Sequence, residues 1–337
     1  MRPNFHPSLV NDVFEDPCLF INFLFENRAI AFDLGDIHNL SSRDILKLTH
    51  IFVSHTHIDH FAGFDRFLRI ALGRDKTVHI FGPRNFLTNI EGKLASYTWN
   101  LADNYEKSLV LRATEVTTEG LYTQTYACRD HFIPKDPVRQ APPSCILTEE
   151  PGFTVKTVIL DHGIPCLGFC LDERFHINIK KDALTSMGLV PGPWLQDFKK
   201  ALYENMPPDT IINARGEKGE HPLTLEKLAD SIAVITQGQK IVYITDVVFN
   251  RSNREKIVLF AQNADQLFME SYFLDSEKDI ASAKHHLTAK QAGEMAGMAC
   301  AKKLIPFHFS PRYTACRDLV EIEAMESFAQ AMGKAQG

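Results

Sequence analysis

The stretch "VSHTHIDHFAGF", residues 53–64, follows a short apolar run and places three histidines and one aspartate within six positions. The four side chains are those of His55, His57, Asp59 and His60. Imidazole and carboxylate groups are the ligands that zinc and similar ions take in proteins. Because burying four such groups without partners would be costly, packing alone does not account for the pattern. The stretch therefore predicts a metal site at the end of a strand.

Five apolar, β-branched runs along the chain end abruptly in an acid or a histidine. Helical patterns separate several of these runs, at residues 43–48, 63–72, 223–235 and 288–301. This alternation indicates an α/β architecture. Ligands collect at the carboxyl ends of strands in such folds, so the five strand ends predict one shared site. The residues at these ends are Asp33, His55, Asp161 with His162, Asp246 and His308.

The composition describes a globular protein, with 337 residues, 45% hydrophobic and 23% charged. A formal net charge of −6 excludes a chain-wide basic surface that would bind nucleic acid by electrostatics alone. No apolar run approaches the roughly 18 residues that a membrane span needs. The first residues carry prolines and acids where a signal peptide needs a basic flank and an apolar block. We therefore expect a cytoplasmic protein without membrane contact.

The chain shows no internal repeat, low-complexity tract or long linker, which predicts a single domain over residues 1–337. The segment 97–151 is rich in Thr, Tyr and Pro and predicts extra hairpins and loops, as a lid or a surface insertion. The richest basic stretch, residues 174–200, is either a solvated helix face or a local basic patch. Seven cysteines, odd in number and never spaced as CxxC, indicate neither a disulfide framework nor a cysteine zinc ribbon.

The spacing within residues 55–60 suits two metal ions. In a loop that leaves a strand, His55 and His57 can turn one way while Asp59 and His60 turn the other. Two ions roughly 3.5 to 4 Å apart, bridged by a hydroxide, lower the pKa of the water and clamp a substrate oxygen. Asp246 is suitably placed to bridge such a pair. The remaining ligands would be His162 and His308.

The motif "SHTHIDH" resembles the signature of the metallo-β-lactamase superfamily, and the likeness extends over about residues 22–313. It implies a four-layered αββα fold with one or two metal ions. It also implies that Asp33, on an early strand, supports a ligand, and that Asp246 bridges the ions. One implied ligand set is His55, His57 and His162, and the other is Asp59, His60 and His308.

Within that superfamily, three stretches are similar to the ribonuclease Z family: "ILDHGIPCLGF" (159–169), "MGLVPGPWLQDFKKAL" (187–202) and "HHLTAKQAGEMAGMACAKKLIPFHFSPRY" (285–313). The likeness implies an endoribonuclease or phosphodiesterase that removes 3′ trailers from precursor tRNA. It further implies two zinc ions, with manganese, iron and cobalt also suited to these ligands. The resemblance also implies a homodimer in which an arm of one subunit holds RNA for the site of the other, and residues 172–220 are the candidate arm-like segment.

The same matching assigns the remaining roles. It makes His286 the proton donor to the leaving 3′ oxygen, because the following Leu-Thr keeps the motif's spacing, and His285 is the competing candidate. Glu270 would orient the donor, and Asp59 could also take the attacking water's proton. Arg312 is either a substrate contact or a structural salt bridge. The other candidate substrate contacts are Lys199 and Lys200, in the basic run after Gly-Pro.

Some stretches depart from the ribonuclease Z pattern. Residues 269–272 read Met-Glu-Ser-Tyr in place of His-Glu-Ala-Thr, and no Gly-rich basic tongue stands out between His162 and Asp246. Two other functions stay open: a hydrolase of the same fold acting on a small phosphodiester such as a cyclic nucleotide, and a non-catalytic RNA- or metal-binding protein. The acidic net charge favours the small substrate, whereas the Gly-Pro-Trp segment and the His-Phe-Ser-x-Arg-Tyr ending favour RNA.

Overall fold

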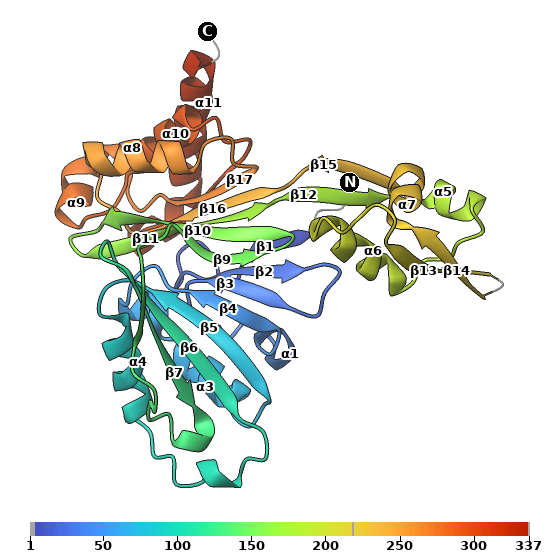
Figure 1. Cartoon of the computed structure of the whole chain (residues 1–337). Coiled ribbons are helices and arrows are strands. Elements are labelled where there is room, and N and C mark those ends of the chain that lie inside the picture. The colour runs from blue at the N-terminus through green and yellow to red at the C-terminus, as the bar shows by residue number, and fades with distance from the viewer. Residues whose placement is uncertain (1–3, 218, 336–337) are drawn as a thin grey trace. The chain divides into compact units, whose positions relative to one another are not determined.

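The structure is a computed structural model that describes residues 4–217 and 219–335 (Figure 1). The chain forms two compact units. Of the described residues, the larger unit contains 4–147, 156–170 and 240–335, and the smaller contains 148–155, 171–217 and 219–239. The expected domain organisation remains a prediction. In the part of the chain that the structure describes, no helix is both long and apolar enough to span a bilayer.

The first large sheet holds eight strands in the order of the sequence. Its strands β3 to β6 are parallel neighbours, and antiparallel strands extend the sheet at both edges. All four residues of β3 are buried, as expected for a strand covered on both faces. The strands are β1 (Phe5–Leu9), β2 (Leu19–Phe23), β3 (Ala29–Phe32), β4 (Leu48–Phe52), β5 (Lys76–Gly82), β6 (Leu109–Val116), β7 (Leu121–Ala127) and β8 (Arg139–Ala141).

The second large sheet has the order β18-β17-β16-β11-β10-β9. The two sheets pack face to face: the ring of Phe32 on β3 lies 5.3 Å from that of Phe169 on β11 and 5.9 Å from that of Tyr243 on β16. The strands of this second sheet are β9 (Ile146–Glu150), β10 (Phe153–Asp161), β11 (Pro165–Glu173), β16 (Lys240–Ile244), β17 (Gln266–Glu270) and β18 (Leu304–Phe307). The segment 97–151, expected to form hairpins and loops, thus supplies β6 to β8 to one sheet and β9 to the other.

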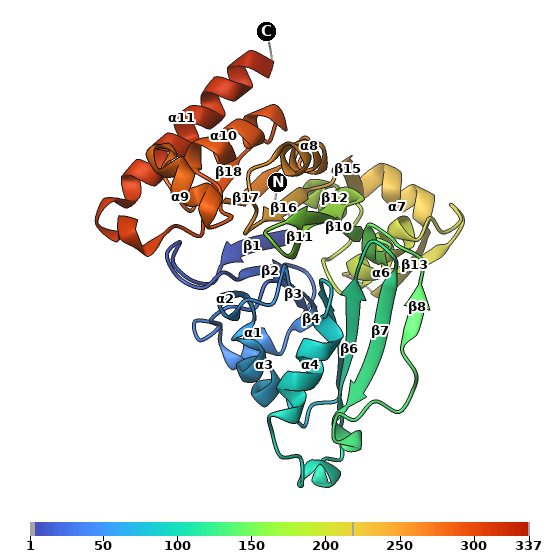
Figure 2. The ribbon, with the colours of Figure 1, turned by 90° about the vertical axis from the view of Figure 1, so that its left-hand side faces the viewer.

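Helices cover the outer faces of the two sheets (Figure 2). Beside the first sheet lie α1 (Ser42–Ile45), α2 (Ile58–Phe61), α3 (Phe64–Ala71) and α4 (Phe86–Ala95), and the short turns η1 (Ala102–Asn104) and η2 (Cys128–Asp130) follow. Beside the second lie α8 (Arg251–Phe260), η3 (Asp275–Glu277), α9 (Lys278–Ala283), α10 (Ala289–Met298), η4 (Pro311–Cys316) and α11 (Arg317–Ala335). This layering confirms the expected αββα fold.

The helix α10 begins at a capping box and packs closely against α11. Thr288 and Gln291 form a reciprocal capping box at its first turn, which satisfies backbone donors that the helix leaves free. Gly293 lets α11 approach closely, since a Cβ there would lie 2.2 Å from the carbonyl oxygen of Ala324. The predicted helix at 288–301 is therefore confirmed, with its end three residues earlier.

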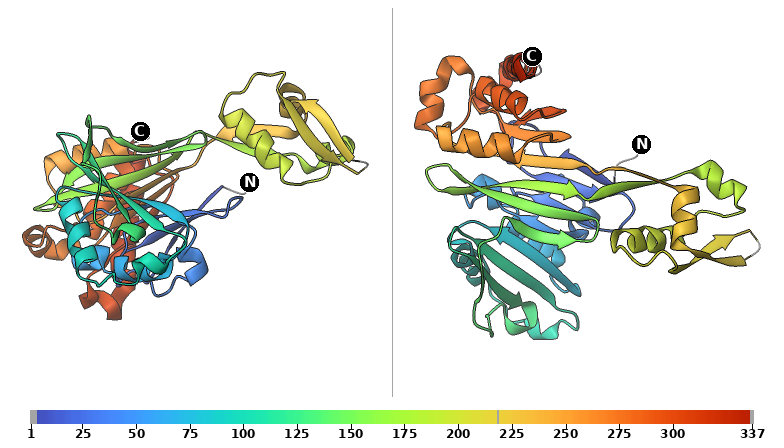
Figure 3. Two further views of the ribbon diagram at one scale, coloured as in Figure 1. Left: turned by 60° about the horizontal axis from the view of Figure 1, so that its bottom comes forward. Right: turned by 45° about the horizontal axis from the view of Figure 1, so that its top comes forward.

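Helices and two two-stranded sheets make up the smaller unit (Figure 3). Its own hydrophobic core includes Trp194, Phe198, Leu228 and Ile232. Its elements are β12 (Phe175–Ile179), α5 (Lys181–Ser186), α6 (Trp194–Tyr203), β13 (Ile211–Gly216), β14 (Gly219–Thr224), α7 (Leu225–Ile232) and β15 (Ala233–Gln237). The helix predicted at 223–235 is too long. It ends at Ile232, and the β-branched residues that follow form a strand paired with β12.

Candidate metal centre

Strand ends of the larger unit supply most of the residues that the sequence singles out. Asp33 follows β3, Asp246 lies two residues beyond β16, and His308 follows β18. All three adopt a left-handed backbone, with φ of 61°, 40° and 56° respectively. Such angles are uncommon for residues with a side chain and cluster at functional sites. The chain therefore turns sharply at each of these three strand ends.

The first group of candidate ligands is His55, His57, His162 and Asp246. One donor atom from each lies within 4.8 Å of the others. The Oδ2 atom of Asp246 lies 3.5 Å from Nε2 of His55 and 3.4 Å from Nε2 of His162. The rings of His55 and His57 meet edge to face with centroids 4.4 Å apart. The structure thus brings together the four residues that the sequence assigned to one metal.

The second group is Asp59, His60, Asp246 and His308, again with one donor atom from each within 4.8 Å of the others. Oδ2 of Asp59 lies 3.5 Å from Nε2 of His60 and 3.6 Å from Nε2 of His308. Oδ2 of Asp246 is 3.4 Å from Nε2 of His60. Asp246 therefore belongs to both groups, in the position expected of a bridging ligand.

The spacing of these donor atoms, and the hydrogen bonds that they lack, suit bound metal ions better than direct contacts between the side chains. The Nε2 atoms of His55 and His60 are buried and have no hydrogen-bond partner among the described atoms. Burying ring nitrogens without a partner is unfavourable. A tetrahedral ion with bonds of about 2.0 to 2.1 Å places its ligand atoms about 3.3 to 3.4 Å apart. The separations of 3.4 to 3.5 Å around Asp246 Oδ2 match that spacing.

Buried hydrogen bonds fix the orientation of two histidines. The carboxylate of Asp33 accepts from Nδ1 of His60 at 2.8 Å, and also from the hydroxyl groups of Ser54 (2.9 Å) and Tyr243 (2.8 Å). His162 donates from Nδ1 to a backbone carbonyl at 2.9 Å. A bond at Nδ1 leaves Nε2 for a metal, as in many metalloenzymes. Asp33 thus holds the ring of His60, and its role in supporting a metal ligand stays a prediction.

The charge states also suit metal binding. Burial lowers the pKa of His55 to about 2, so this ring is neutral and its nitrogen can donate to a metal. Burial opposes ionisation of Asp59, but the neighbouring imidazole groups of His308 and His60 lower its pKa below the usual range. Burial also opposes protonation of His308, yet the carboxylate of Asp246 raises its pKa to about 9. Metal binding at His308 would therefore release a proton.

A pocket opens onto both groups, within the larger unit. Besides ligand candidates it is lined by Tyr272, Phe273, Lys284, Ser310 and Arg312, together with His286. The sequence analysis did not single out Lys284, because one exposed lysine in a helical stretch carries no signal of its own. The full lining is His57, Asp59, His162, Asp246, Tyr272, Phe273, Lys284, His286, His308, Ser310 and Arg312.

The structure separates the two candidate proton donors. His286 lines the pocket, and its Nδ1 lies 2.8 Å from Oε2 of Glu270. His285 is absent from the pocket lining, and its backbone carbonyl is the group that accepts from His162. The arrangement thus favours His286 as the donor and gives its neighbour a supporting role.

The three candidate substrate contacts lie in different places. Arg312 lines the pocket, with Nη1 2.6 Å from Oε1 of Glu277 and its guanidinium 5.2 Å above the ring of Phe273. Lys199 and Lys200 lie on α6 in the smaller unit and do not line the pocket. Burial lowers the pKa of Lys199, whereas Lys200 is exposed and lies 3.9 Å from Glu204.

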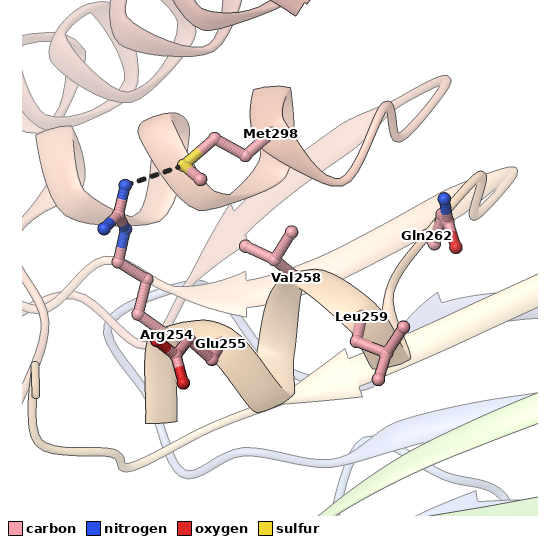
Figure 4. Close-up of a pocket in the computed structure, with 6 residues that line it drawn as sticks. All are labelled: Arg254, Glu255, Val258, Leu259, Gln262 and Met298. Carbon is pink, nitrogen blue, oxygen red and sulfur yellow. Dashed lines mark hydrogen bonds between the residues drawn. The ribbon is translucent and has the colours of Figure 1, made fainter. Parts of the chain in front are cut away.

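Another pocket lies between α8 and α10 (Figure 4). Arg254 donates a hydrogen bond of 3.2 Å to the sulfur of Met298 across it. The other residues that line it are Glu255, Val258, Leu259 and Gln262. None of these residues belongs to the candidate metal groups of the described chain. The candidate chemistry therefore belongs to the pocket lined by His286.

Comparisons with solved structures support this description of the fold. The metallo-β-lactamase fold protein YhfI from Bacillus subtilis superposes with a TM-score of 0.54 at 15% identity, over 96% of this chain and 94% of that one. The chain has the metallo-β-lactamase fold. A long form of RNase Z from yeast matches with a TM-score of 0.51 at 14% identity and covers 92% of this chain but 38% of that one.

Sequence comparisons relate this metallo-β-lactamase-fold chain to ribonuclease Z, although no family model matches it. The ribonuclease Z of Deinococcus radiodurans is 29% identical over 283 residues, which are 82% of this chain and 80% of that protein. The ribonuclease Z of Rippkaea orientalis is 27% identical over 89% of this chain and 82% of its own length. The chain is a metal-dependent hydrolase that resembles ribonuclease Z.

Proposed function

We propose that the chain is an endoribonuclease of ribonuclease Z type that removes 3′ trailers from precursor tRNA. The observation that carries the proposal is that one pocket is lined by members of two ligand groups, which Asp246 joins, and by His286, which is hydrogen-bonded to the buried Glu270. The curated relatives named ribonuclease Z, which this chain matches over most of its length, supply the substrate. A single-metal site without a proton donor would not favour this reaction.

The proposed ligands are His55, His57 and His162 for one zinc ion and Asp59, His60 and His308 for the other, with Asp246 shared. Bound metal ions would lower the pKa of a water molecule and polarise a phosphate oxygen. Zinc is proposed because nitrogen and carboxylate donors dominate both sets, and manganese, iron or cobalt would accept the same ligands. We propose Asp33 as the residue that orients His60.

Asp59 and His286 would carry out the two proton transfers of the hydrolysis. Water attacks the phosphorus that follows the discriminator nucleotide, and Asp59 takes the proton that this water loses. The bond between phosphorus and the 3′ oxygen breaks. His286 then donates a proton to that oxygen, so the tRNA ends in a 3′ hydroxyl and the trailer keeps a 5′ phosphate. Glu270 holds His286 through its Nδ1 and stabilises the protonated ring.

The same proposal includes residues that would bind the RNA away from the reacting atoms. Arg312 would bind a phosphate or the terminal base, because its planar fork suits both. Lys199 and Lys200, on α6, would contact RNA as members of an arm that includes residues 172–220. The proposed assembly is a homodimer in which the arm of one subunit holds the substrate of the other.

The test compares two substrates under matched conditions. Metal-loaded and chelator-treated protein are incubated with an end-labelled precursor tRNA and, separately, with bis(p-nitrophenyl) phosphate. We expect one metal-dependent cut after the discriminator nucleotide, with a 3′ hydroxyl on the tRNA. Mature tRNA that ends at the discriminator nucleotide is the control, because it has no trailer to remove. Cleavage of the chromogenic diester alone would instead indicate a phosphodiesterase for small substrates.

A further inference from the structure

The ring of Tyr272 lies flat against the imidazole of His286. The ring centroids are 4.1 Å apart and the planes differ by only 12°. The same phenol ring meets His308 edge to face, with centroids 5.1 Å apart at 76°. None of the roles described so far uses this tyrosine, which stands where the ribonuclease Z pattern has threonine. The stacking of Tyr272 on His286 is therefore a feature of this chain that the ribonuclease Z pattern does not explain.

Backbone hydrogen bonds explain why the two rings meet. The strand β17 ends at Glu270, and both Glu270 and Tyr272, two residues further along, contact the ring of His286. Phe273 donates from its backbone to Leu287 at 3.2 Å, and its carbonyl accepts from the backbone of Ala289 at 2.7 Å. These bonds align the two segments, and His286 then lies opposite the pair.

The two contacts restrain different motions of the imidazole. The hydrogen bond between Glu270 and Nδ1 of His286 holds one edge of the ring, but it leaves rotation about that bond free. A second ring stacked on the face of the imidazole removes that rotation. The side chain of His286 lines the pocket, and Nε2 is the ring nitrogen that the hydrogen bond to Glu270 does not use.

We propose that Tyr272 is a positioning residue that holds the ring of His286 in the orientation from which it protonates the leaving oxygen. This inference rests on the function proposed above. A proton donor displaced by about 1 Å can lose on the order of 100-fold in rate, so positioning alone has a measurable effect. The aromatic ring is the group that matters, because the stack does not require the phenol hydroxyl.

The test compares two substrates whose leaving groups differ in their need for a proton. A ribose 3′ oxygen needs a proton as it departs, whereas p-nitrophenolate is stable without one. We expect Tyr272→Leu to lower kcat for precursor tRNA by about 10- to 100-fold with KM changed less than about twofold. The loss on bis(p-nitrophenyl) phosphate should be at least about tenfold smaller. Tyr272→Phe, which keeps the ring, should restore cleavage of precursor tRNA to within about threefold of the wild type.

Control measurements separate positioning from folding and from binding. Metal content and melting temperature are measured for each variant, and Tyr272→Met replaces the leucine variant if that protein loses metal. Tyr122→Leu, on β7 of the first sheet, is the matched control and should change neither activity. A phenylalanine variant as impaired as the leucine variant would overturn the proposal. So would equal losses on both substrates, or a change confined to KM.

Failure of this inference differs from failure of the proposed function. If the wild-type protein cleaves the diester but not precursor tRNA, the substrate is wrong, whatever Tyr272 does. If the wild type cleaves both and Tyr272→Leu cleaves precursor tRNA at the wild-type rate, the function stands and the positioning role is overturned.

Discussion

Glu270 accepts a hydrogen bond of 2.8 Å from Nδ1 of His286, and its other carboxylate oxygen accepts from the backbone N–H of Val247 at 2.8 Å. The carboxylate is fully buried. Val247 directly follows Asp246, so one buried group joins the proposed proton donor to the segment that carries the proposed bridging ligand. Burial opposes protonation of His286, yet the nearby Glu270 raises its pKa above the usual value. The pair is therefore arranged to favour the protonated form of the donor.

The first prediction concerns His286 itself. His286→Ala should retain both metals but lose about 10²- to 10⁴-fold in the rate of precursor tRNA cleavage, the range for general acid catalysis. His285→Ala is the matched control and should lose much less, because its ring does not line the pocket. Single-turnover rates and elemental analysis are measured on the same samples. A larger loss from His285→Ala would transfer the donor role to that residue.

Glu270→Gln tests the electrostatic part of the pair. Because the carboxylate raises the pKa of His286, its removal should lower that pKa. Activity that needs protonated His286 is lost as the pH rises through this pKa. The alkaline limb of the rate profile should therefore move to lower pH in the variant. A limb that stays in place, measured with precursor tRNA at fixed metal content, would show that the limb belongs to another group.

A third prediction concerns the shared ligand. Asp246→Ala should lower the metal content from about two ions per chain to well below one, since its Oδ2 lies within 3.5 Å of Nε2 of His55, His60 and His162. Asp161→Asn is the control, because this carboxylate accepts from the backbone of Gly163 and belongs to no candidate metal group among the described residues. Elemental analysis after gel filtration decides the matter. Retention of both ions by Asp246→Ala would remove the bridging role.

Asp33 should act through His60. Asp33→Ala would free Nδ1 of His60 and leave the buried hydroxyl of Tyr243 without its acceptor. Loss of such a support typically weakens metal affinity by about 10- to 100-fold. Tyr243→Phe removes one donor to the same carboxylate and should have a smaller effect. Competition with a chelator, followed by metal analysis, measures both. Unchanged affinity in Asp33→Ala would exclude the orienting role.

The fifth prediction uses His50, outside the metal groups. Burial lowers the pKa of His50 from 6.5 to about 3, with the neighbouring His79 adding to the effect. The unfolded chain therefore binds a proton below about pH 6.5 that the folded chain does not, and stability falls as the pH falls towards 3. The expected slope is at most about 1.4 kcal/mol per pH unit.

His50→Phe should flatten that acid limb, because the uncharged ring can keep the stacked contact with His79, whose centroid lies 4.9 Å away. Urea denaturation from pH 7 to 5 gives the free energy of unfolding of both proteins. Subtracting one free energy of unfolding from the other cancels the contribution of titrating groups that both proteins share. His6→Phe, at an exposed position on β1, is the control. Parallel curves for His50→Phe and the wild type would contradict the assignment.

The sequence alone predicted much of the site. The ligands His55, His57, Asp59 and His60 lie within six positions of one another, and such local density is visible without a fold. Apolar runs that end in a polar residue also predicted the α/β class, because burial of a strand and the position of its end are both local properties. The same strand ends pointed to His162, Asp246 and His308, and the likeness to the metallo-β-lactamase superfamily divided the ligands into two sets.

Other features appeared only when distant segments met. Asp246 is separated by more than 180 residues from His60, and only the packing of the two sheets brings their side chains within 3.4 Å. The choice of His286 over its neighbour, the stacking of Tyr272 and the place of Lys284 at the pocket depend on backbone turns and strand pairing. The short extent of α7 has the same origin, since strand pairing with β12 outweighs the helical period after Ile232. Side-chain identity and spacing are local, whereas contacts between segments depend on the free energy of the whole fold, which no single stretch encodes.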